Sequence, residues 1–432
     1  MSVCDEKTKY VFDDDKRPAL PYVAGACFSI KRHKRLTPFD RGICYEFPEV
    51  FSLSDPVLPS ETLRPSEILK PKHNWTPWSR SSSKRTDPGN DPPGTITERY
   101  LRHRPRKTKP YKKDMTTRRL EIVRQIRARD GAYAQVVQCR VDGIRGPLVA
   151  KIFDPLYRWE DVDLDMVFSP VGLSESDWSR EAAAYARIRE RGLDGRYTPR
   201  FEGCWSFDIP YELELELASN SATDDITAPT TTTSGRQSER GEEKRRGGLS
   251  EELTRRTIKV TRNVRLLLME HIPGDSILHL LETGAYRNIP PDVRMDLLAR
   301  IGEAQSALWH IRVSHGDPHA RNVVEWRATL VDFGSSVVLD LPNARSNLRD
   351  RPPPALPPNP MTRCRGLWPV YDLRLEPDWE DAASEEANWI DKRYDSFEMR
   401  RKWMEARWGE GSASAHRYQP VEYDKLYNGP GD

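Results

Sequence analysis

The sequence lacks the features that mark membrane, secreted and zinc-binding proteins. Its six cysteines are scattered, with no Cys-x-x-Cys pair and no matching histidine spacing, so neither a zinc site nor a disulfide framework is expected. No apolar run approaches the roughly 18 residues that a membrane-spanning helix requires. The first residues lack the apolar core of a secretory signal. We therefore expect an intracellular protein, cytoplasmic or nuclear, with no membrane partner.

Net charge and apolar content are also low. The formal net charge is only +2, so the composition gives no reason to expect a nucleic-acid partner. One basic run, Arg102 to Lys113, is more simply a solvated linker than a nuclear-import or anionic-surface patch. With 37% apolar residues and 35 prolines in 432 residues, part of the chain is expected to lack a packed core.

Two polar stretches are expected to be disordered. Residues 1–117 contain one short apolar cluster, Tyr22 to Ile30, which fits either a strand docked on the main domain or no structure at all. From Ser52 to Tyr111 the chain is dense in Pro, Ser, Thr and charge, and its apolar surface is too small to offset the entropy of ordering. Residues 219–256 are similarly polar and are predicted to form a disordered insert between two strands.

The most informative stretch spans residues 313–334. His315-Gly-Asp317 is followed by Asn322, five residues after the aspartate, and then by Asp332-Phe-Gly334. Mg²⁺ takes hard oxygen ligands and retains waters, so one carboxylate, one amide oxygen and nucleotide phosphates suffice to hold it. The intervening residues read as two short strands joined by a turn, a hairpin that would bring Asn322 and Asp332 to the same rim. The sequence therefore predicts a metal site at these two residues and leaves Asp317 to orient an incoming hydroxyl.

This stretch resembles the catalytic loop and magnesium loop of the protein-kinase-like superfamily. The signature of that family is His-Arg-Asp, an asparagine five residues after the aspartate, and Asp-Phe-Gly. The resemblance implies an α+β, bilobal kinase-like fold, with an antiparallel N-lobe sheet and one main helix over a shortened helical C-lobe. It implies ATP and Mg²⁺ as cofactors, Asp317 as the catalytic acceptor of the hydroxyl proton, and Asn322 and Asp332 as magnesium ligands. His315 is interpreted as structural.

Residues expected of a nucleotide site also occur upstream, in the family's order. The strand-like segment 146–153 contains a single lysine, Lys151, in a context similar to the family's Val-Ala-x-Lys, which implies contact with the α- and β-phosphates. The next helical pattern, from an N-cap at Ser174 to Ile188, offers Glu181 as the partner of this lysine. Glu175 and Asp177 come earlier and are interpreted as favourable charges at the helix start.

The loop that would cover the phosphates departs from the family pattern. It lies at residues 127–134, between predicted strands at 120–126 and 136–141. The three family glycines correspond to Arg129, Gly131 and Ala134, so only Gly131 is retained. Because side chains hinder the close approach of a backbone to phosphate, this departure weakens the expected grip of the loop on ATP.

The segment Glu270 to Gly274 follows predicted strands at 201–207, 211–217 and 261–269, and is similar to the kinase hinge. The resemblance places Met269 at the back of the adenine pocket and assigns adenine binding to the Glu270 carbonyl and the Ile272 N–H.

Two further helices are predicted beyond this segment. One opens at Pro290 and carries an apolar stripe that would pack under the catalytic loop; the other repeats apolar residues from Ile390 to Trp408. The prolines between Leu341 and Pro360 exclude regular structure there.

Together these features predict four regions. They are a largely disordered extension at 1–117, a kinase-like N-lobe at 118–273 with the insert 219–256, a helical C-lobe at 274–410, and a tail at 411–432. The favoured function is ATP- and Mg²⁺-dependent transfer of phosphate to a protein hydroxyl, as in divergent kinase-like proteins of filamentous fungi. His-Gly-Asp followed by His319 also resembles the aminoglycoside and choline kinase branch, which implies a small-molecule hydroxyl. The loop at 127–134 has lost two family glycines, and no Ala-Pro-Glu follows Gly334, although that motif ends the corresponding segment in a typical protein kinase. These departures leave a pseudokinase binding module as a third interpretation.

Overall fold

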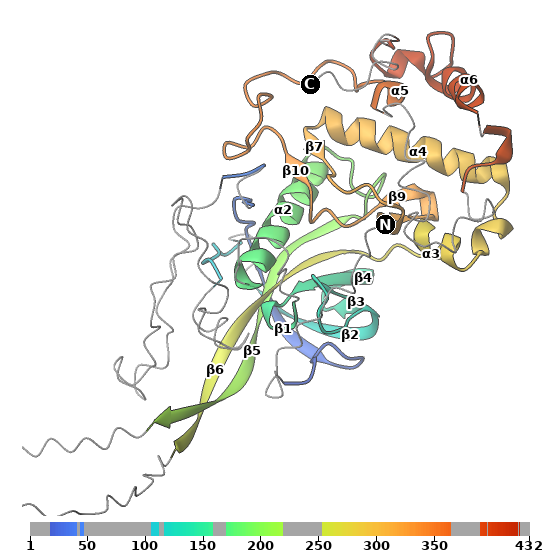
Figure 1. Ribbon diagram of the computed structural model, residues 1–432. Coiled ribbons are helices and arrows are strands. Elements are labelled where there is room, and N and C mark those ends of the chain that lie inside the picture. Colours follow the sequence, from blue (N-terminus) through green and yellow to red (C-terminus); the bar gives the residue numbers. More distant parts are fainter. Residues whose placement is uncertain are drawn as a thin grey trace, which may run out of the picture. The chain divides into compact units, whose positions relative to one another are not determined.

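The fold is α+β and is built around a closed barrel of six antiparallel strands (Figure 1). This computed structural model describes residues 18–40, 44–46, 105–111, 116–158, 170–218, 253–363, 389–394, 396–421 and 423. The strands follow the order β1–β2–β3–β4–β6–β5 around the barrel. Their bounds are β1 Cys27–His33, β2 Thr117–Arg127, β3 Gln135–Val141, β4 Ile144–Phe153, β5 Phe201–Ala218 and β6 Leu253–Glu270.

The far ends of β5 and β6, within Ile209–Arg262, belong to a second compact unit of the chain. The contacts described below lie in the first unit. Two strands were predicted at 201–207 and 211–217, but β5 runs through both as one strand. Residues 219–252, most of the predicted insert, lie outside the described residues.

The barrel is filled by alternate side chains of its strands. Along β3, Val137, Cys139 and Val141 are buried and alternate with more exposed neighbours. This period of two is what places successive side chains on opposite faces of a strand. Lys151 of β4 lies on the other face, because it pairs with Val136, whereas Ala150 pairs with the inward-facing Val137. The outer face of β3 and β4 is therefore the one on which a polar site can form.

The N-terminal strand β1 completes the barrel. It pairs antiparallel with β2 along residues 27–31 and with β5 at residues 31–33. The apolar cluster at Tyr22 to Ile30 therefore contributes a docked strand. This strand lies within the region predicted to be a largely disordered extension, so the ordered domain begins well before residue 118. Residues 47–104, which hold most of the polar stretch of that region, lie outside the described residues.

Residues just after β1 contact the segment that follows Gly334. The Tyr45 hydroxyl accepts a hydrogen bond from the Val338 N–H, and the Arg345 N–H donates to the Cys44 carbonyl at 2.8 Å. The Ser176 hydroxyl donates to the Phe39 carbonyl at 2.8 Å. The residues between Phe39 and Tyr45 that the structure describes therefore contact both helix α2 and the chain beyond Gly334.

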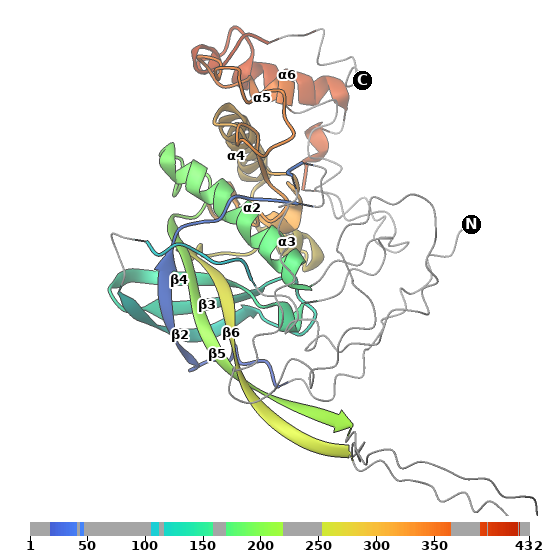
Figure 2. The ribbon, with the colours of Figure 1, turned by 90° about the vertical axis from the view of Figure 1, so that its left-hand side faces the viewer.

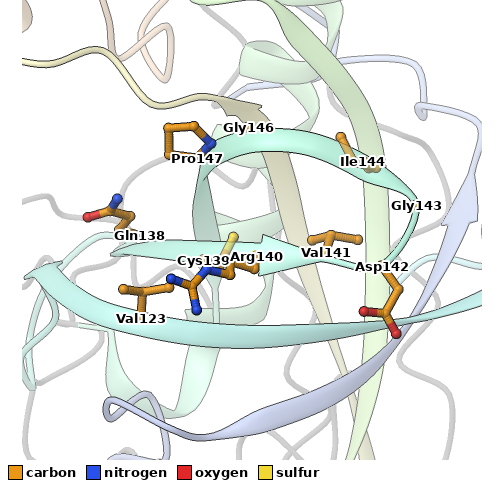
Figure 3. A pocket seen from close by; sticks show the side chains of 10 residues that line it. All are labelled: Val123, Gln138, Cys139, Arg140, Val141, Asp142, Gly143, Ile144, Gly146 and Pro147. Atoms are coloured by element: carbon orange, nitrogen blue, oxygen red, sulfur yellow. The ribbon is translucent and has the colours of Figure 1, made fainter.

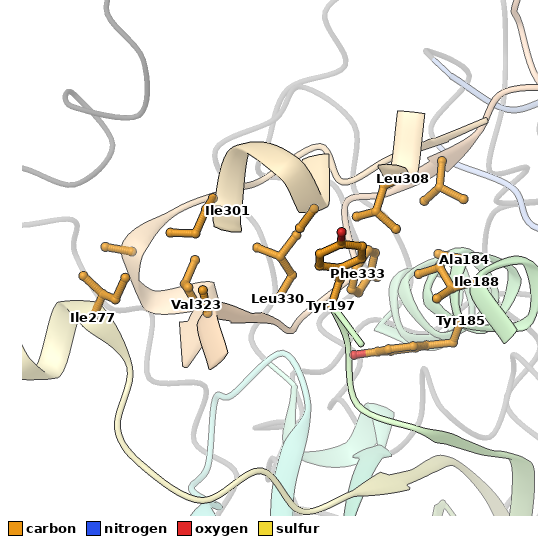
Figure 4. Packing of buried hydrophobic residues seen from close by; sticks show 14 of the residues in the cluster. Ala184, Tyr185, Ile188, Tyr197, Ile277, Ile301, Leu308, Val323, Leu330 and Phe333 are labelled. Carbon is orange, nitrogen blue, oxygen red and sulfur yellow. The ribbon is translucent and has the colours of Figure 1, made fainter. Parts of the chain in front are cut away.

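The helices form a second layer beside the barrel. They are α2 Pro170–Glu190, α3 Ile277–Glu282, α4 Pro291–His310, α5 Pro360–Arg363 and α6 Phe397–Trp408. Helix α2 lies along the barrel (Figure 2). The ring of its Trp178 lies 5.5 Å from that of His33 of β1, measured between centroids. One continuous apolar core runs from α2 through α4 to α6. Figure 4 shows the part of this core that includes Ile188 of α2, Phe333 and Leu308 of α4. Among the described residues, no helix combines the length and apolarity needed to cross a membrane.

Two helix starts differ from the prediction. Helix α2 begins at Pro170, so Ser174 lies inside it and is not its N-cap. Helix α6 begins at Phe397 with Ser396 as its N-cap, so Ile390 and Tyr394 precede it. The predicted stripe of α4 is confirmed: Ile301 and Leu308 are buried in the core.

The chain between α4 and α5 forms two small antiparallel sheets. In one, β7 Val313–Ser314 pairs with β10 Val337–Val338. In the other, β8 Val323–Val324 pairs with β9 Thr329–Leu330, which is the predicted hairpin. Short 3₁₀ turns connect the elements: η1 Pro155–Tyr157, η2 Ala285–Asn288, η3 Ala320–Asn322, η4 Trp326–Ala328, η6 Lys392–Tyr394 and η7 Ala415–Arg417.

Candidate functional site

Three predicted site residues meet at the edge of the barrel. The Lys151 Nζ of β4 lies 2.7 Å from Glu181 Oε2 of α2 and 2.7 Å from Asp332 Oδ1, which follows β9. Lys151 and Glu181 are buried, whereas the Asp332 side chain is 32% exposed to solvent. One ammonium group therefore bridges two carboxylates that come from separate elements, and only the Asp332 carboxylate is open to solvent.

The charges of this trio are set by burial and by mutual attraction. Burial raises the pKa of Glu181 to about 7, although Lys151 opposes the shift. Burial acts to lower the pKa of Lys151, but the carboxylates of Asp332 and Glu181 outweigh it and raise that pKa above its ordinary value. Burial also opposes ionisation of Asp332, yet Lys151 holds the pKa of this carboxyl well below its usual range. At neutral pH the lysine is a cation and Asp332 is an anion.

Helix α2 is anchored by ion pairs at its N-terminal half. Glu175 lies 3.0 Å from the Arg265 guanidinium of β6, and Asp177 lies 2.7 Å from that of Arg158. The interpretation of Glu175 and Asp177 as charges at the helix start is wrong, because α2 begins at Pro170 and both residues lie beyond its first turn. Their carboxylates pair instead with arginines outside the helix. These contacts fix the rotation of α2 and so the direction in which Glu181 points.

Phe333 connects α2 to the loop that begins at His315. Its N–H donates to Glu181 Oε1 at 3.3 Å. Its ring lies 5.0 Å from that of Tyr185 of α2 and 4.4 Å from that of His315, measured between ring centroids, and Figure 4 shows it in the apolar core. Asp332 adopts a positive φ of 62° and accepts the Gly334 N–H at 3.3 Å. The carboxylate of Asp332 is therefore held by the turn that also buries the phenyl ring.

Asp317 and Asn322 are also brought together. The Asn322 Nδ2 donates to both the carbonyl and the Oδ2 of Asp317, each at 2.9 Å. Arg321 donates to both carboxylate oxygens of Asp317, at 3.0 and 3.2 Å. The Val331 N–H donates to the Asn322 carbonyl at 2.9 Å, so the hairpin holds Asn322 beside the residue that precedes Asp332. Arg321 was not singled out from the sequence, although its position four residues after Asp317 was visible there.

His315 supports the loop in the way predicted of a structural residue. Its Nδ1 accepts the Asp317 N–H at 3.3 Å. The proton of the neutral ring is therefore on Nε2, which lies 3.0 Å from the Val331 carbonyl and donates to it. Burial lowers the pKa of this imidazole, which keeps it neutral at physiological pH.

Gly316 is required by a close backbone contact. Its φ is +81°, and a Cβ built there would lie 2.2 Å from the Ser335 carbonyl oxygen. No side chain fits at this distance, because real Cβ contacts are essentially never below 3.0 Å. The loop can therefore pack against the chain after Gly334 only because residue 316 is a glycine.

The loop between β2 and β3 is bound to the protein itself. The Gly131 N–H donates to the Tyr157 carbonyl of η1 at 2.9 Å. The Gln135 side chain accepts from the Arg129 N–H at 2.8 Å and donates to the Arg129 carbonyl at 2.9 Å. The phosphate contact predicted for Gly131 would therefore have to replace an existing hydrogen bond.

The predicted hinge residues lie where β6 ends and the chain leaves the barrel. Glu270 is the last residue of β6 and pairs with Leu148 of β4. The His271 N–H donates to the Pro147 carbonyl at 3.1 Å, and Met269 is buried in the core. Ile272 follows directly and is half-buried. The adenine contacts assigned to Glu270 and Ile272 stay a prediction.

A hollow on the barrel is separate from these residues. It has a volume of about 600 Å³ and is lined by Val123, Gln138, Cys139, Arg140, Val141, Asp142, Gly143, Ile144, Gly146 and Pro147 (Figure 3). None of the predicted site residues lines it.

The part of the chain that the structure describes contains no cluster of three or more His, Cys, Asp or Glu side chains able to hold a metal. A metal ion at Asp332 would thus need the Asn322 amide oxygen and ligands from outside the protein, which is the way Mg²⁺ is usually held beside a nucleotide.

Comparison with known proteins does not identify a family. No protein-family model matches the sequence, and no curated protein matches it. What remains to indicate a function is the set of motif residues and their geometry.

Proposed function

We propose that this chain is an ATP- and Mg²⁺-dependent phosphotransferase of the protein-kinase-like superfamily that acts on a protein hydroxyl. In this proposal the fold is bilobal: the barrel and α2 correspond to the N-lobe, and the chain from α3 onward corresponds to a shortened helical C-lobe. The observation that carries the proposal is the position of the Lys151 Nζ, 2.7 Å from both Glu181 and Asp332. Lysine, helix glutamate and Asp-Phe-Gly aspartate are the parts that such an active site has to assemble.

The donor set fits magnesium and a polyphosphate. Asp332 is ionised and partly exposed, and the Asn322 amide nitrogen is used by Asp317, which leaves the amide oxygen as the ligand atom. These two residues would hold the metal, and Lys151 would hold phosphate oxygens. When bound, Mg-ATP supplies the phosphoryl group and neutralises the charge that develops on it.

The residues of this chain would contribute mainly position and charge. Glu181 holds Lys151 in place and is itself fixed by the Phe333 N–H. Asn322 and Arg321 orient the Asp317 carboxylate, which would accept the proton of the acceptor hydroxyl. Such positioning converts a bimolecular step into an effectively unimolecular one.

A small-molecule hydroxyl is the second candidate acceptor. Gly316, which the contact with Ser335 requires, occupies the place of the arginine in His-Arg-Asp and is what the aminoglycoside and choline kinase branch has there. His319, two residues after Asp317, belongs to the same resemblance.

Phosphoryl transfer with purified protein tests the proposal. The protein is offered ATP labelled in the γ-phosphate, with pooled peptides in one reaction and pooled amino-alcohol metabolites in the other. Asp317→Asn, which keeps the size of the side chain, is the control, and so is omission of Mg²⁺. Label on peptides supports the first acceptor class, and label on metabolites supports the second. Nucleotide binding without transfer would indicate a pseudokinase module, and a protein that binds no nucleotide would refute the proposal.

A further inference from the structure

Arg127, the last residue of β2, reaches the same carboxylate as Lys151. Its Nη2 lies 3.7 Å from Asp332 Oδ2, and its side chain is 48% exposed. Asp332 therefore faces two cations, one buried and one at the solvent edge. A half-exposed guanidinium at this distance gains little stability from the ion pair itself, because solvent screens the attraction between exposed charges. A contribution of this ion pair to folding stability therefore does not explain why Arg127 lies beside Asp332.

A β-bulge places Arg127 on the face that carries Lys151. The register shifts between Gln125 and Arg127, so that Gln125 faces Val137 and Arg127 faces the adjacent Val136. Val136 in turn faces Lys151 across β3 and β4. Directly opposed residues of neighbouring strands share a face, so Arg127, Val136 and Lys151 form one row across three strands.

Without the extra residue, a regular ladder would set Ile126 opposite Val136 and would turn Arg127 to the other face. Bulges of this kind redirect a side chain and are frequent next to active sites.

The backbone of the adjoining loop is engaged elsewhere. The Gly131 N–H is bonded to Tyr157, and both backbone groups of Arg129 are bonded to the Gln135 side chain. The Ala132 N–H donates to the Arg129 carbonyl at 3.3 Å. A ligand phosphate next to β2 would therefore meet side chains in place of a row of free loop amides.

We infer that Arg127 is a phosphate-binding residue that acts with Lys151 on the polyphosphate of the nucleotide and substitutes for the missing glycine-rich turn. The inference rests on the proposed nucleotide site. A guanidinium suits this role because it presents two parallel N–H donors to phosphate oxygens and stays charged at all relevant pH values. Lys151 alone would offer a single, buried cation to a polyphosphate.

Binding of a ligand series to purified full-length protein tests this inference. Affinities of adenosine, Mg-ADP and Mg-ATP are measured by calorimetry for the wild type and for Arg127→Ala and Arg127→Gln. Arg119→Ala is the matched control, because Arg119 lies on the same strand, is exposed and contacts Cys27 and Glu121 instead of Asp332. We expect both Arg127 variants to bind Mg-ATP about ten- to a hundredfold more weakly, with adenosine unaffected, since a hydrogen bond to a charged group is lost.

The outcomes separate the inference from the proposed function. If the wild type binds Mg-ATP and both Arg127 variants bind it equally well or more tightly, Arg127 does not bind phosphate and the inference fails, while the nucleotide site stands. Equal weakening toward adenosine would likewise overturn it, because that result indicates a structural effect. If the wild type binds none of the three ligands, the proposed function and the inference both fail.

Discussion

The substitution Gly316→Ala isolates the contact that joins the loop from His315 to Asn322 to the chain after Gly334. The added Cβ meets two penalties: a positive φ of +81°, and a Ser335 carbonyl oxygen 2.2 Å away. Left-handed backbone costs an alanine about 1–2 kcal/mol. Relieving the contact requires a backbone shift of about 1 Å, and overpacking of this kind costs about 1–3 kcal/mol more.

Gly25→Ala is the matched control. Gly25 has a φ of +83°, almost the same as Gly316, but nothing lies within 4 Å of a Cβ built there. The two variants share the left-handed penalty and the loss of glycine flexibility in the unfolded chain, so their difference reports the contact with Ser335 alone. We expect the urea concentration at the unfolding midpoint to be about 0.3–1 M lower for Gly316→Ala than for Gly25→Ala. This assumes that the unfolding free energy falls by about 3 kcal/mol per molar urea.

The proposed phosphoryl transfer gives the second measurement. Asp317 follows Gly316 directly, so the shift that accommodates the new methyl group moves the carboxylate, and a misplacement of about 1 Å can cost about a hundredfold in rate. We therefore expect phosphoryl transfer to fall strongly in Gly316→Ala and to be retained in Gly25→Ala. Equal unfolding midpoints for the two variants would refute the reasoning, because they would show that the Ser335 carbonyl yields without cost.

Three further predictions follow from the site and its supports. Asp332→Ala should remove the Mg²⁺ dependence of nucleotide binding while leaving the fold intact; calorimetry that still shows dependence on the metal would contradict the ligand assignment. The pKa of Glu181 rises from 4.5 to about 7 on folding, so the folded state binds more protons and its unfolding free energy should fall as pH rises through that interval. Glu181→Gln should flatten this part of the urea-unfolding profile, and an unchanged slope would argue against the shift. Tyr45→Phe leaves the buried Val338 N–H without its acceptor and should lower the unfolding free energy by about 1–3 kcal/mol; an unchanged unfolding midpoint would show that this hydrogen bond contributes little.

The elements that sequence predicts well are those with a local cause. The strand predicted at 136–141 and the β8–β9 hairpin depend on neighbouring residues, and the structure has both. The start of α2 was misplaced because Ser174 is a good N-cap and competes with Pro170. Proline favours the first helical turn, where its missing N–H has no cost, and here the helix begins with it.

What sequence did not predict depends on contacts between distant segments. The bulge that redirects Arg127 is a property of the pairing of β2 with β3 and leaves no residue signature. The reason for Gly316 lies in Ser335, many residues later. β1 is held by pairing with β2 and β5, which are distant in the sequence. The apolar cluster from Tyr22 to Ile30 could therefore be read from sequence either as a docked strand or as unstructured.

The strand order of the barrel has a consequence for synthesis of the chain. β5 is made before β6, but β6 is the strand that pairs with β4, while β5 pairs with β1. Until the ribosome has released β6, the edge of β4 from Leu148 to Phe153 has no partner strand. That edge is apolar apart from Lys151, and an unpaired, mostly apolar edge is a template for pairing with another chain. A nascent chain that stops before β6 therefore has an open sheet with an unpaired edge, which favours aggregation. Pairing of β6 with β4 closes the barrel and removes that edge.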